Sequence, residues 1–397
     1  MRELEVLGDG HLKLDFADWK EFFETEMTEL VRGQLKRLIE QALLAERDRY
    51  LDLGYYEHDP QFRFDYRNGS YFRDFATRLG LLRRLRIPRT RKPFRSQILP
   101  RYKRRQEAVH ELVRQAFLRG ISTRQVGQVL EPVLGEAYSA QTVSNITREL
   151  NSAVAQFHRR QLRDHYLYLF LDGVVLKVRD STGTVVRRTV LVACGITVSG
   201  RRELLAYHLA HGESEASWVE FLQDLFRRGL EGKNLRLIVS DGSTGLRAAL
   251  PVVFGGVAVQ LCWAHKLRNI AGKVKRQEGS CVAAAAAAIY RADNKTQAQQ
   301  AFRHWKQHWE HRRPRAVACV ERDLDALLNF FDTPSAHWKK VRTTNVIERA
   351  FREVRRRTRP MSSFSNKESC ERIVYGVITN LNRSWERKPL PEFTQTT

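Results

Sequence analysis

The chain has 397 residues, enough for two or three domains and at least one sizeable hydrophobic core. Apolar residues make up 42% of the chain and charged residues 28%, a balance that excludes a disordered or membrane-embedded protein. Lysine and arginine total 68 against 45 acidic residues, and the resulting formal charge of +23 indicates a polyanionic partner, with nucleic acid as the first expectation.

The N-terminal part is predicted to form a helix followed by a basic arm. Apolar positions at helical spacing predict a helix from about Ala17 to Tyr50, within a segment of residues 1–65 that we expect to serve dimerisation or scaffolding. The stretch Arg83–Arg105 holds eleven basic residues, no acidic one and three prolines, which prevent a continuous helix. We expect this stretch to contact DNA phosphates; a disordered linker is the alternative. The candidate contacts are Arg83, Arg84, Arg86, Arg89, Arg91 and Lys92.

Three short helices are expected next, in the pattern of a helix-turn-helix. The first spans Gln106–Leu118, Ser122 with Gln125 forms a capping box for the second, and Ser139 can cap the third. Apolar residues of the third helix form a buried stripe, which leaves a polar face for a DNA groove. That face consists of Gln141, Thr142, Ser144, Asn145, Thr147 and Arg148. A plain structural bundle is the alternative. The basic arm and these helices form the predicted DNA-binding region, residues 66–160.

From residue 161 the pattern becomes that of a mixed α+β or α/β domain. Strands are predicted at 165–179, 184–197, 201–209, 235–241 and 257–262, with a helix from Ser214 and others after the fourth and fifth strands. The order βββαβαβα is shared by the ribonuclease H-like fold, which has a mixed five-stranded sheet. We expect such a catalytic domain at 161–276, an all-α insertion at 277–340, a second catalytic part at 341–387 and a frayed tail at 388–397.

Three carboxylates are candidates for chemistry. Asp172 lies inside a hydrophobic strand, where an ionised carboxylate is costly without a partner such as a metal ion; an arginine partner is the alternative. Asp241 follows a parallel strand, at the edge where α/β proteins place ligands, or it caps the next helix. Glu348 lies on a helix predicted from about Asn345 to Arg357, whose basic residues we expect to hold DNA: Arg352, Arg355 and Arg356. An ordinary ion pair between Glu348 and Arg352 is the alternative.

The predicted fold brings the first strand, the fourth strand and the last helix to one place. Three carboxylates there can hold two Mg²⁺ or Mn²⁺ ions at about 3.5–4 Å from each other. One ion would activate the attacking oxygen and the other would stabilise the leaving oxygen, so no covalent enzyme-DNA link is needed.

Several motifs in this order resemble the transposases of Mutator-type elements, specifically their bacterial insertion-sequence relatives. They are LDGVVLKVR, ESEASWVEFLQDLFRRGL, LIVSDGSTGL, QLCWAHKLRNI and TTNVIERAFREVRRRTRPM, with YRNGSYFRDFATRLG, IPRTRKPF and GISTRQVGQVL upstream. The resemblance spans about Tyr66 to Trp385. It implies a ribonuclease H-like domain with a DDE triad, which falls on Asp172, Asp241 and Glu348, and a helical insertion before the glutamate.

The family's C-x-x-H element corresponds to Cys262 and His265, which are followed by Arg268. Cys-x-x-His is half of a zinc site, but no second pair at suitable spacing accompanies it. We therefore expect a zinc-free role at the active site. His265 and Arg268 either contact DNA near the scissile phosphate or brace the triad, whereas a buried Cys262 that packs as a small hydrophobe is the structural alternative.

The working hypothesis is a transposase that binds the terminal inverted repeats of its element and transfers their 3′-hydroxyls into target DNA, with two protomers pairing the two ends. A regulator that binds DNA without cutting it and a structure-specific nuclease of the same fold are the alternatives. No apolar run approaches the ~20 residues of a bilayer span, and the five scattered cysteines suggest no disulfide framework. We therefore expect no membrane partner and a cytoplasmic location at the bacterial nucleoid.

Overall fold

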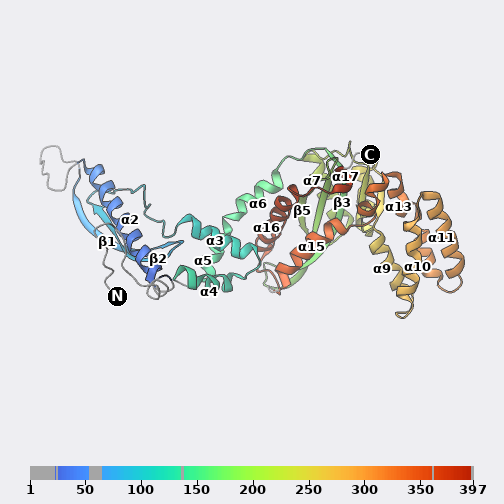
Figure 1. The fold of residues 1–397 in the computed structure, drawn as a ribbon, viewed down its shortest axis with the longest axis horizontal. Helices are drawn as coiled ribbons and strands as arrows, with labels where there is room; N and C mark the ends of the chain where they lie inside the picture. The colour runs from blue at the N-terminus through green and yellow to red at the C-terminus, as the bar shows by residue number, and fades with distance from the viewer. Residues whose placement is uncertain (1–22, 24–25, 53–64, 136–137, 360–361, 395–397) are drawn as a thin grey trace. The chain divides into compact units, whose positions relative to one another are not determined.

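The computed structural model describes residue 23 and residues 26–52, 65–135, 138–359 and 362–394 (Figure 1). The chain divides into two compact units. The first contains residues 1–117 and 121–148, and the second contains residues 118–120 and 149–397. None of the described helices is long and apolar enough to cross a membrane.

The first unit begins with a helix packed on a two-stranded antiparallel sheet. Helix α2 (Met27–Leu51) covers strands β1 (Arg67–Thr77) and β2 (Gly80–Thr90). Most of the predicted helix before Met27 lies outside the described residues. The core beneath α2 is formed by Leu43, Phe75, Leu82, Leu85, Ile87 and Leu99. Our division at residue 65 therefore separates a helix from the strands on which it packs.

The first half of the predicted basic arm is a strand, not an irregular segment. In β2, Leu82, Leu85 and Ile87 are buried, whereas the arginines between and after them are exposed. This alternation has the two-residue period of a strand, with one face on a core and the other in solvent. Because this strand is rich in arginine, its alternation of buried and exposed residues was not recognised in the sequence. Pro88 is tolerated because β2 pairs only with β1 and needs no further partner.

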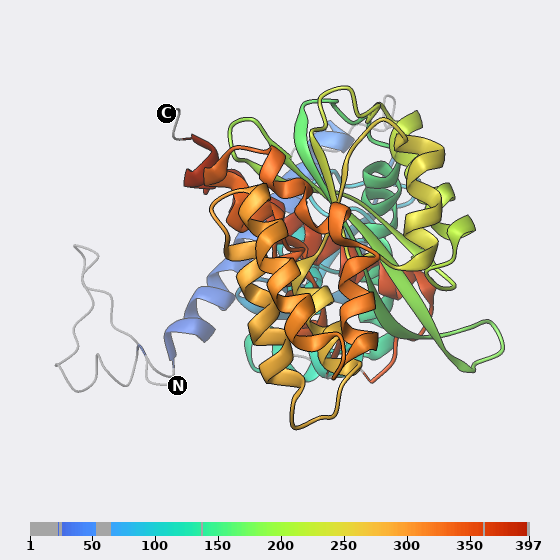
Figure 2. The ribbon, with the colours of Figure 1, turned by 90° about the vertical axis from the view of Figure 1, so that its right-hand side faces the viewer.

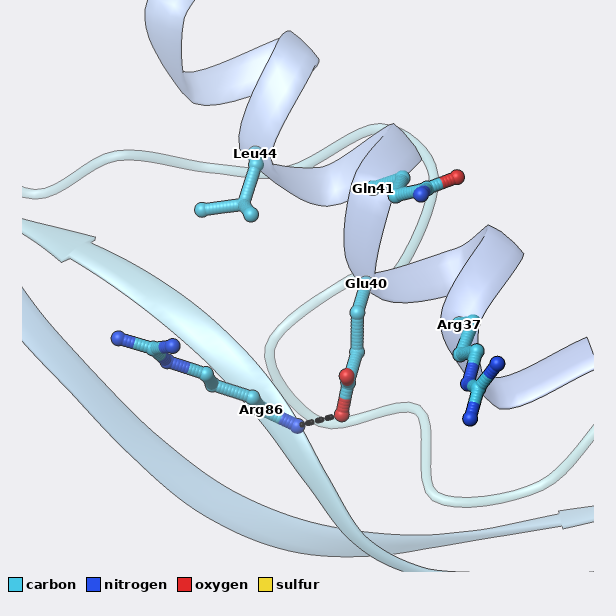
Figure 3. Close-up of a pocket in the computed structure, with 5 residues that line it drawn as sticks. All are labelled: Arg37, Glu40, Gln41, Leu44 and Arg86. Carbon is cyan, nitrogen blue, oxygen red and sulfur yellow. Dashed lines mark hydrogen bonds between the residues drawn. The ribbon is translucent and has the colours of Figure 1, made fainter. Parts of the chain in front are cut away.

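Figure 3 shows the contact between α2 and β2. Glu40 accepts a hydrogen bond of 2.8 Å from the backbone N–H of Arg86. Together with Arg37, Gln41 and Leu44, these two residues line a hollow of about 210 Å³. Its volume is below the ~300 Å³ at which ligand pockets begin, so we interpret it as part of the helix-strand contact.

Three helices lie where the sequence predicts them: α3 (Glu107–Leu118), α4 (Thr123–Leu134) and α5 (Ala140–Arg148). The Ser122 hydroxyl accepts a hydrogen bond from the backbone N–H of Gln125, and Ser139 caps α5 in the same way through Thr142. Val143 and Ile146 are buried as expected. Thr147 is also buried and donates to the Ser144 carbonyl, so its assignment to the exposed face is wrong. The chain continues into α6 (Leu150–Arg159), which was not predicted as a separate helix.

The second unit is built on a five-stranded mixed sheet, as predicted. The strand order is β5-β4-β3-β6-β7. β3 pairs antiparallel with β4, which pairs antiparallel with β5, while β6 and β7 extend the sheet in parallel. The strands are β3 (Tyr166–Arg179), β4 (Val185–Thr197), β5 (Arg202–Ala210), β6 (Leu237–Ser240) and β7 (Val259–Leu261).

Helices flank this sheet. Helices α7 (Glu215–Arg227) and α8 (Thr244–Phe254) bury Trp218, Phe221 and Leu246 in one core with Leu169 and Leu171 of β3. Phe226, near the end of α7, is exposed. Helix α15 (Asn345–Thr358) packs on β3 and β4, and α16 (Lys367–Glu386), which was not predicted, packs on β5 and α6.

Between β7 and α15 the chain forms a series of helices joined by short turns. Helices α9 (Trp263–Gly272), α10 (Gly279–Arg291), α11 (Lys295–Trp309) and α12 (Pro314–Glu321) pack against one another (Figure 2). They are followed by α13 (Leu324–Leu328), two 3₁₀ turns (Asn329–Asp332 and Ser335–His337) and α14 (Trp338–Val341). The buried Lys266 of α9 forms an ion pair with Asp323 before α13, which fixes α9 to the helices after it.

The predicted frayed tail is ordered for part of its length. Helix α17 (Pro391–Thr394) buries Phe393, and the backbone N–H of Leu390 donates to the Gly200 carbonyl. Leu390 and Phe393 are apolar side chains in this short polar segment, and both are buried. Residues 395–397 lie outside the described part.

Candidate active site

Asp172 and Asp241 lie on neighbouring strands at the same level. In the parallel pairing of β3 with β6, Leu171 lies opposite Ser240. Asp172 is the residue after Leu171, and Asp241 is the residue after Ser240, at the end of β6. Asp241 directly follows β6 because Gly242, with φ of +81°, turns the chain away there. The Asp241 carboxylate accepts a hydrogen bond of 3.0 Å from the Ser243 backbone N–H, at the start of α8. The sheet itself therefore brings these two carboxylates together.

Asp172 is held in conditions that disfavour its charge. Its side chain is 6% exposed, and its Oδ1 accepts a hydrogen bond of 2.7 Å from the Gly173 backbone N–H. Burial and the nearby charge of Asp241 raise its pKa from 3.8 to about 7, although His265 and the Gly173 bond oppose the shift. Among the described residues no lysine or arginine forms an ion pair with Asp172, and a buried carboxyl beside a second carboxylate is a site that a cation would stabilise.

Glu348 lies in the first turn of α15, near the site but turned towards a different partner. Its backbone N–H donates to the Thr344 carbonyl, and the stripe formed by Ile347, Ala350 and Phe351 is buried as predicted. Its Oε1 lies 3.0 Å from Nη2 of Arg268 on α9. The expected alternative, an ion pair with Arg352 on the same helix, is not formed; Arg352 is exposed.

Cys262 and His265 lie at the start of α9 and contact the residue before α15. Cys262 is 1% exposed, and its Sγ accepts hydrogen bonds from the backbone N–H and the hydroxyl of Thr344, at 3.2 and 3.4 Å. The Thr344 hydroxyl also lies 3.5 Å from His265 Nδ1. The Cys262 backbone N–H donates to the Ser240 carbonyl at 2.8 Å. Cys262 therefore links the end of β6, beside Asp241, to the beginning of the glutamate helix.

The charges of this cluster depend on one another. Burial alone would raise the pKa of Cys262, but hydrogen bonds to His265 and Thr344 outweigh burial and lower it. The bond to Cys262 raises the pKa of His265 against burial, and the charges of Asp172 and Asp241 add to that effect. His265 and Asp172 therefore act on each other: His265 opposes the rise in the pKa of Asp172, and Asp172 raises the pKa of His265.

Glu213 is a further carboxylate at this place, and it was not among the predicted site residues. It lies between β5 and α7, where its Oε1 is 2.6 Å from the position that a Cβ atom on Gly173 would occupy. Burial and the charge of Asp241 raise its pKa, which the Ser243 hydroxyl and His265 oppose. The sequence feature that could have identified Glu213 as a site residue is its position: it is an acidic residue after the third strand, directly before Ser214, which caps α7.

These acidic groups are neighbours but do not converge on one point. In the part of the chain described here, no three ligand atoms of this site lie within 4.8 Å of one another. The parallel strands bring Asp172 and Asp241 together, whereas the side chain of Glu348 forms its ion pair with Arg268 of α9.

The candidate DNA contacts lie in both units. All six basic residues from the predicted arm are exposed: Arg83, Arg84, Arg86, Arg89, Arg91 and Lys92. Three of their guanidinium groups lie over aromatic rings: Arg84 at 5.0 Å from the Phe72 ring, Arg89 at 5.8 Å from Tyr71 and Arg91 at 4.9 Å from Tyr66. On α5, Gln141, Asn145 and Arg148 are exposed, and Thr142 and Ser144 are half-buried. In the second unit, Arg352, Arg355 and Arg356 are exposed along α15.

Comparisons with known proteins cover nearly the whole chain. Residues 9–388 match the family described as Transposase, Mutator family. The chain is 34% identical to the transposase for insertion sequence element ISRM5 of Rhizobium meliloti, over 89% of this chain and 88% of that protein. It is 33% identical to the transposase for IS905 of Lactococcus lactis subsp. lactis, over 90% of each. It is 30% identical to the transposase for IS256 in transposon Tn4001 of Staphylococcus aureus, over 88% of this chain and 90% of that protein.

Proposed function

Because the chain belongs to the Mutator family of transposases, we propose that it cuts and joins DNA strands at the ends of its mobile element. In this proposal it binds the terminal inverted repeats, cleaves to expose 3′-hydroxyls and transfers them to target DNA. Asp172, Asp241 and Glu348 are the catalytic residues. The observation that carries the proposal is the parallel register of β3 and β6, which sets the two aspartates side by side, with the glutamate helix tied to the same sheet edge through Cys262.

The chemistry of the donor groups fits a hard divalent cation. Asp172 and Asp241 offer carboxylate oxygens, which Mg²⁺ and Mn²⁺ prefer. Burial and the charge of Asp241 raise the pKa of Asp172 to about 7, and a bound cation would favour its charged form. Asp172, Asp241 and Glu348 would hold two ions. When bound, such ions supply the Lewis acidity that activates the attacking oxygen and stabilises the leaving one.

The surrounding residues position these ligands. Thr344 precedes α15 and is fixed by Cys262, so the start of the glutamate helix keeps its place relative to Asp241. This geometry favours the bracing role for Cys262 and His265 over a direct DNA contact. Arg268 forms an ion pair with Glu348; in this proposal Glu348 would help to hold an ion and Arg268 would contact a DNA phosphate. Exposed Arg352, Arg355 and Arg356 continue the path for the DNA backbone.

DNA binding is assigned to the first unit in two parts. The exposed arginines of β2 and the loop after it contact phosphates, which supplies affinity without sequence preference. The polar side chains of α5 read the terminal repeat in the major groove, as the recognition helix of a helix-turn-helix does. Two protomers pair the two element ends, so we expect a homodimer on DNA.

The test uses the full-length protein and DNA that carries its element's ends, with Mg²⁺ or Mn²⁺. Wild type is compared with Asp241→Ala and with Asp325→Ala, which changes an exposed aspartate on α13. We expect 3′-end cleavage and strand joining by wild type and Asp325→Ala, and DNA binding without cleavage by Asp241→Ala. If wild type binds the ends and never cuts them, the proposal is wrong and a DNA-binding regulator is the better account.

A further inference from the structure

Strands β3 and β4 extend beyond the rest of the sheet as a two-stranded ribbon. β6 pairs with β3 only up to Leu171, and β5 pairs with β4 only from Thr189. The two strands remain paired with each other beyond these points, as far as Arg179 and Val185, and the green hairpin that they form projects from the sheet in Figure 2. We call this part, residues 175–189, the ribbon. It leaves the sheet at the edge where the two aspartates of the candidate site lie.

The ribbon has one buried face and one charged face. Val174, Leu176 and Val178 alternate along β3 and are buried on the side on which α15 packs. The residues between them continue the opposite face, which α7 and α8 cover nearer to the middle of the sheet. On the ribbon this second face is exposed, with the side chains of Val175, Lys177, Arg179, Val185 and Arg187. The ribbon therefore presents a basic surface to the solvent.

Two cations on this surface oppose each other directly. Lys177 is the partner of Arg187 in the pairing of β3 with β4, and both side chains are exposed. Among the described residues no carboxylate forms an ion pair with either of them. The Asp180 carboxylate instead closes the hairpin turn, where it accepts hydrogen bonds from the backbone N–H groups of Thr182 and Thr184. Like charges directly opposite each other destabilise an antiparallel pair, so an anion bound between these two would relieve the repulsion.

Backbone hydrogen bonds hold the ribbon in place. The Lys177 carbonyl accepts a hydrogen bond of 2.9 Å from the Phe364 N–H, and the Arg179 N–H donates to the Phe364 carbonyl at 2.9 Å. The segment after α15 thereby adds to the outer edge of β3. At the tip, Arg179 Nη1 donates to the Gly183 carbonyl at 2.9 Å. The bonds to Phe364 involve only the backbone, so the Lys177 and Arg187 side chains can be changed without removing them.

A DNA backbone is the anion that fits this surface. Strand transfer requires two duplexes at one active site, the element end and the target. The exposed arginines of α15 lie on one side of the sheet, and the charged face of the ribbon lies on the other. Lys177 is five positions beyond Asp172 (177 − 172), about 17 Å along an extended strand. That is roughly the length of five base pairs, so a duplex at the sheet edge can reach the ribbon.

We propose that the charged face of the ribbon binds the phosphate backbone of the target DNA, with Lys177 and Arg187 on neighbouring phosphates. This inference rests on the proposed function, which assigns the terminal repeat to the first unit. Target DNA lacks that repeat, so it needs a binding surface elsewhere. Contacts to phosphates supply affinity without sequence preference, as a target of varied sequence requires.

The experiment measures binding of a second duplex. Full-length protein is saturated with unlabelled element-end DNA in EDTA, and a labelled duplex of unrelated sequence is then titrated. In Lys177→Gln/Arg187→Gln we expect affinity for this duplex to fall at least about 10-fold, and the slope of log affinity against log salt to decrease by about two, one for each phosphate. Affinity for the element ends should stay as in wild type. In the joining assay the variant should need more target DNA to reach an unchanged maximal rate.

A charge-matched control removes two exposed arginines from the other end of the sheet. Arg201 precedes β5 and Arg236 precedes β6, and both strands begin at the end away from the two aspartates. Arg201→Gln/Arg236→Gln should therefore bind the second duplex with wild-type affinity and with the wild-type salt slope. An equal loss in this control would show that total charge, not the ribbon, determines the affinity.

Lys177→Glu distinguishes DNA binding from a structural role. Glutamate opposite Arg187 forms an attractive cross-strand pair, so the unfolding midpoint in urea should equal or exceed that of wild type. Affinity for the second duplex should nevertheless fall at least as far as in Lys177→Gln/Arg187→Gln. Retained or increased stability together with weaker DNA binding supports the proposal, because a pair that served only the fold would not produce it.

The outcomes separate this inference from the proposed function. If the ribbon variants bind the second duplex as wild type does, the inference is refuted, while cleavage by wild type and its loss in Asp241→Ala leave the proposed function intact. If their affinity for element ends falls in parallel, the ribbon binds the element ends and the assignment to target DNA is wrong. If wild type never cuts, the proposed function is wrong, and selective loss of second-duplex binding would still identify the ribbon as a DNA-binding surface.

Discussion

Arg268 Nη2 lies 3.0 Å from Glu348 Oε1, so the glutamate of the proposed triad forms an ion pair with a side chain of another helix. The arginine side chain is 61% exposed and that of the glutamate 27%. Ion pairs this exposed contribute about 0–1 kcal/mol to stability. The contact is therefore weak enough to exchange, and its effect should appear in metal binding and not in folding.

Replacing Arg268 by glutamine should free Glu348 for metal. We expect the Arg268→Gln protein to bind Mn²⁺ up to about fivefold more tightly without DNA, since at most ~1 kcal/mol of competition is removed. Its free energy of unfolding should change by less than about 1 kcal/mol. Arg352→Gln, which removes an exposed arginine of α15 that does not contact Glu348, should leave Mn²⁺ affinity unchanged. Weaker Mn²⁺ binding in Arg268→Gln would contradict the exchange.

Cys262 should matter through the helix that carries Glu348. In Cys262→Ala the buried backbone N–H and hydroxyl of Thr344 lose their acceptor, which should cost about 1–3 kcal/mol of stability. Cleavage should fall further than DNA affinity, because the start of α15 is no longer fixed beside Asp241. Urea unfolding and a cleavage assay measure the two effects. Cys262→Ser, which keeps an acceptor, should recover part of both, and Cys281→Ala, at an exposed cysteine, should change neither.

The sheet and the two aspartates were predictable because their signals are local. A 14-residue, mainly apolar segment rich in leucine, valine and aromatic residues defines β3, and turn residues separate the strands after it. Parallel pairing then follows from the intervening helices, which places Asp172 beside Asp241. The helix of Glu348 has the same kind of local signal, a buried stripe at helical spacing.

What the sequence did not reveal depends on long-range packing. Glu213 lies against Gly173 of β3, where a side chain would meet its Oε1, and no local pattern in the sequence indicates this contact. Lys266, the residue after His265, is buried in an ion pair with Asp323, and no local pattern in the sequence indicates this partner. Strand β2 was not predicted because it contains many arginines. Only one of its faces packs on a core, and α2 supplies the other side of that core. Charge alone does not distinguish these environments.

The raised pKa of Asp172 predicts that the metal-free protein loses stability as pH rises. Because the folded-state pKa, about 7, lies above the ordinary 3.8, the folded protein holds an extra proton between these values. Stability should therefore fall from about pH 4 to pH 7 by an amount on the order of a few kcal/mol, and level off above. The raised pKa of His265 acts in the same direction, since its stabilising charge is lost as pH rises beyond 6.5.

Urea midpoints in EDTA at pH 5 and pH 8 measure this effect. Asp172→Asn cannot ionise, so its midpoint should change less between the two pH values, and at pH 8 it should be more stable than wild type. Saturating Mg²⁺ should restore wild-type stability at pH 8, because the ion neutralises the carboxylate. Identical pH dependence in wild type and Asp172→Asn would show that Asp172 is not the group responsible.

Substitutions in the two parts of the DNA-binding unit should impair DNA binding in different ways. In Arg84→Ala/Arg86→Ala, exposed arginines of β2 that bind phosphates are removed while the backbone bond of residue 86 to Glu40 remains. Affinity for element ends and for unrelated DNA should fall together, and the slope of log affinity against log salt should decrease by about one for each phosphate that is no longer bound. The exposed Arg303 of α11 offers the charge-matched control, Arg303→Ala, which should leave the slope unchanged.

Asn145→Ala should instead reduce discrimination between sequences. Asn145 is exposed on α5 and held by a hydrogen bond of 3.0 Å from Gln141, which orients its amide. Removing a hydrogen bond to a base edge costs about 1–3 kcal/mol at the terminal repeat and nothing on unrelated DNA, so only the specific affinity should fall. The salt slope should stay as in wild type, because every phosphate-binding side chain is retained. Equal losses of affinity for both DNAs would mean that α5 binds the DNA backbone. Other residues of the first unit would then have to recognise the terminal repeat.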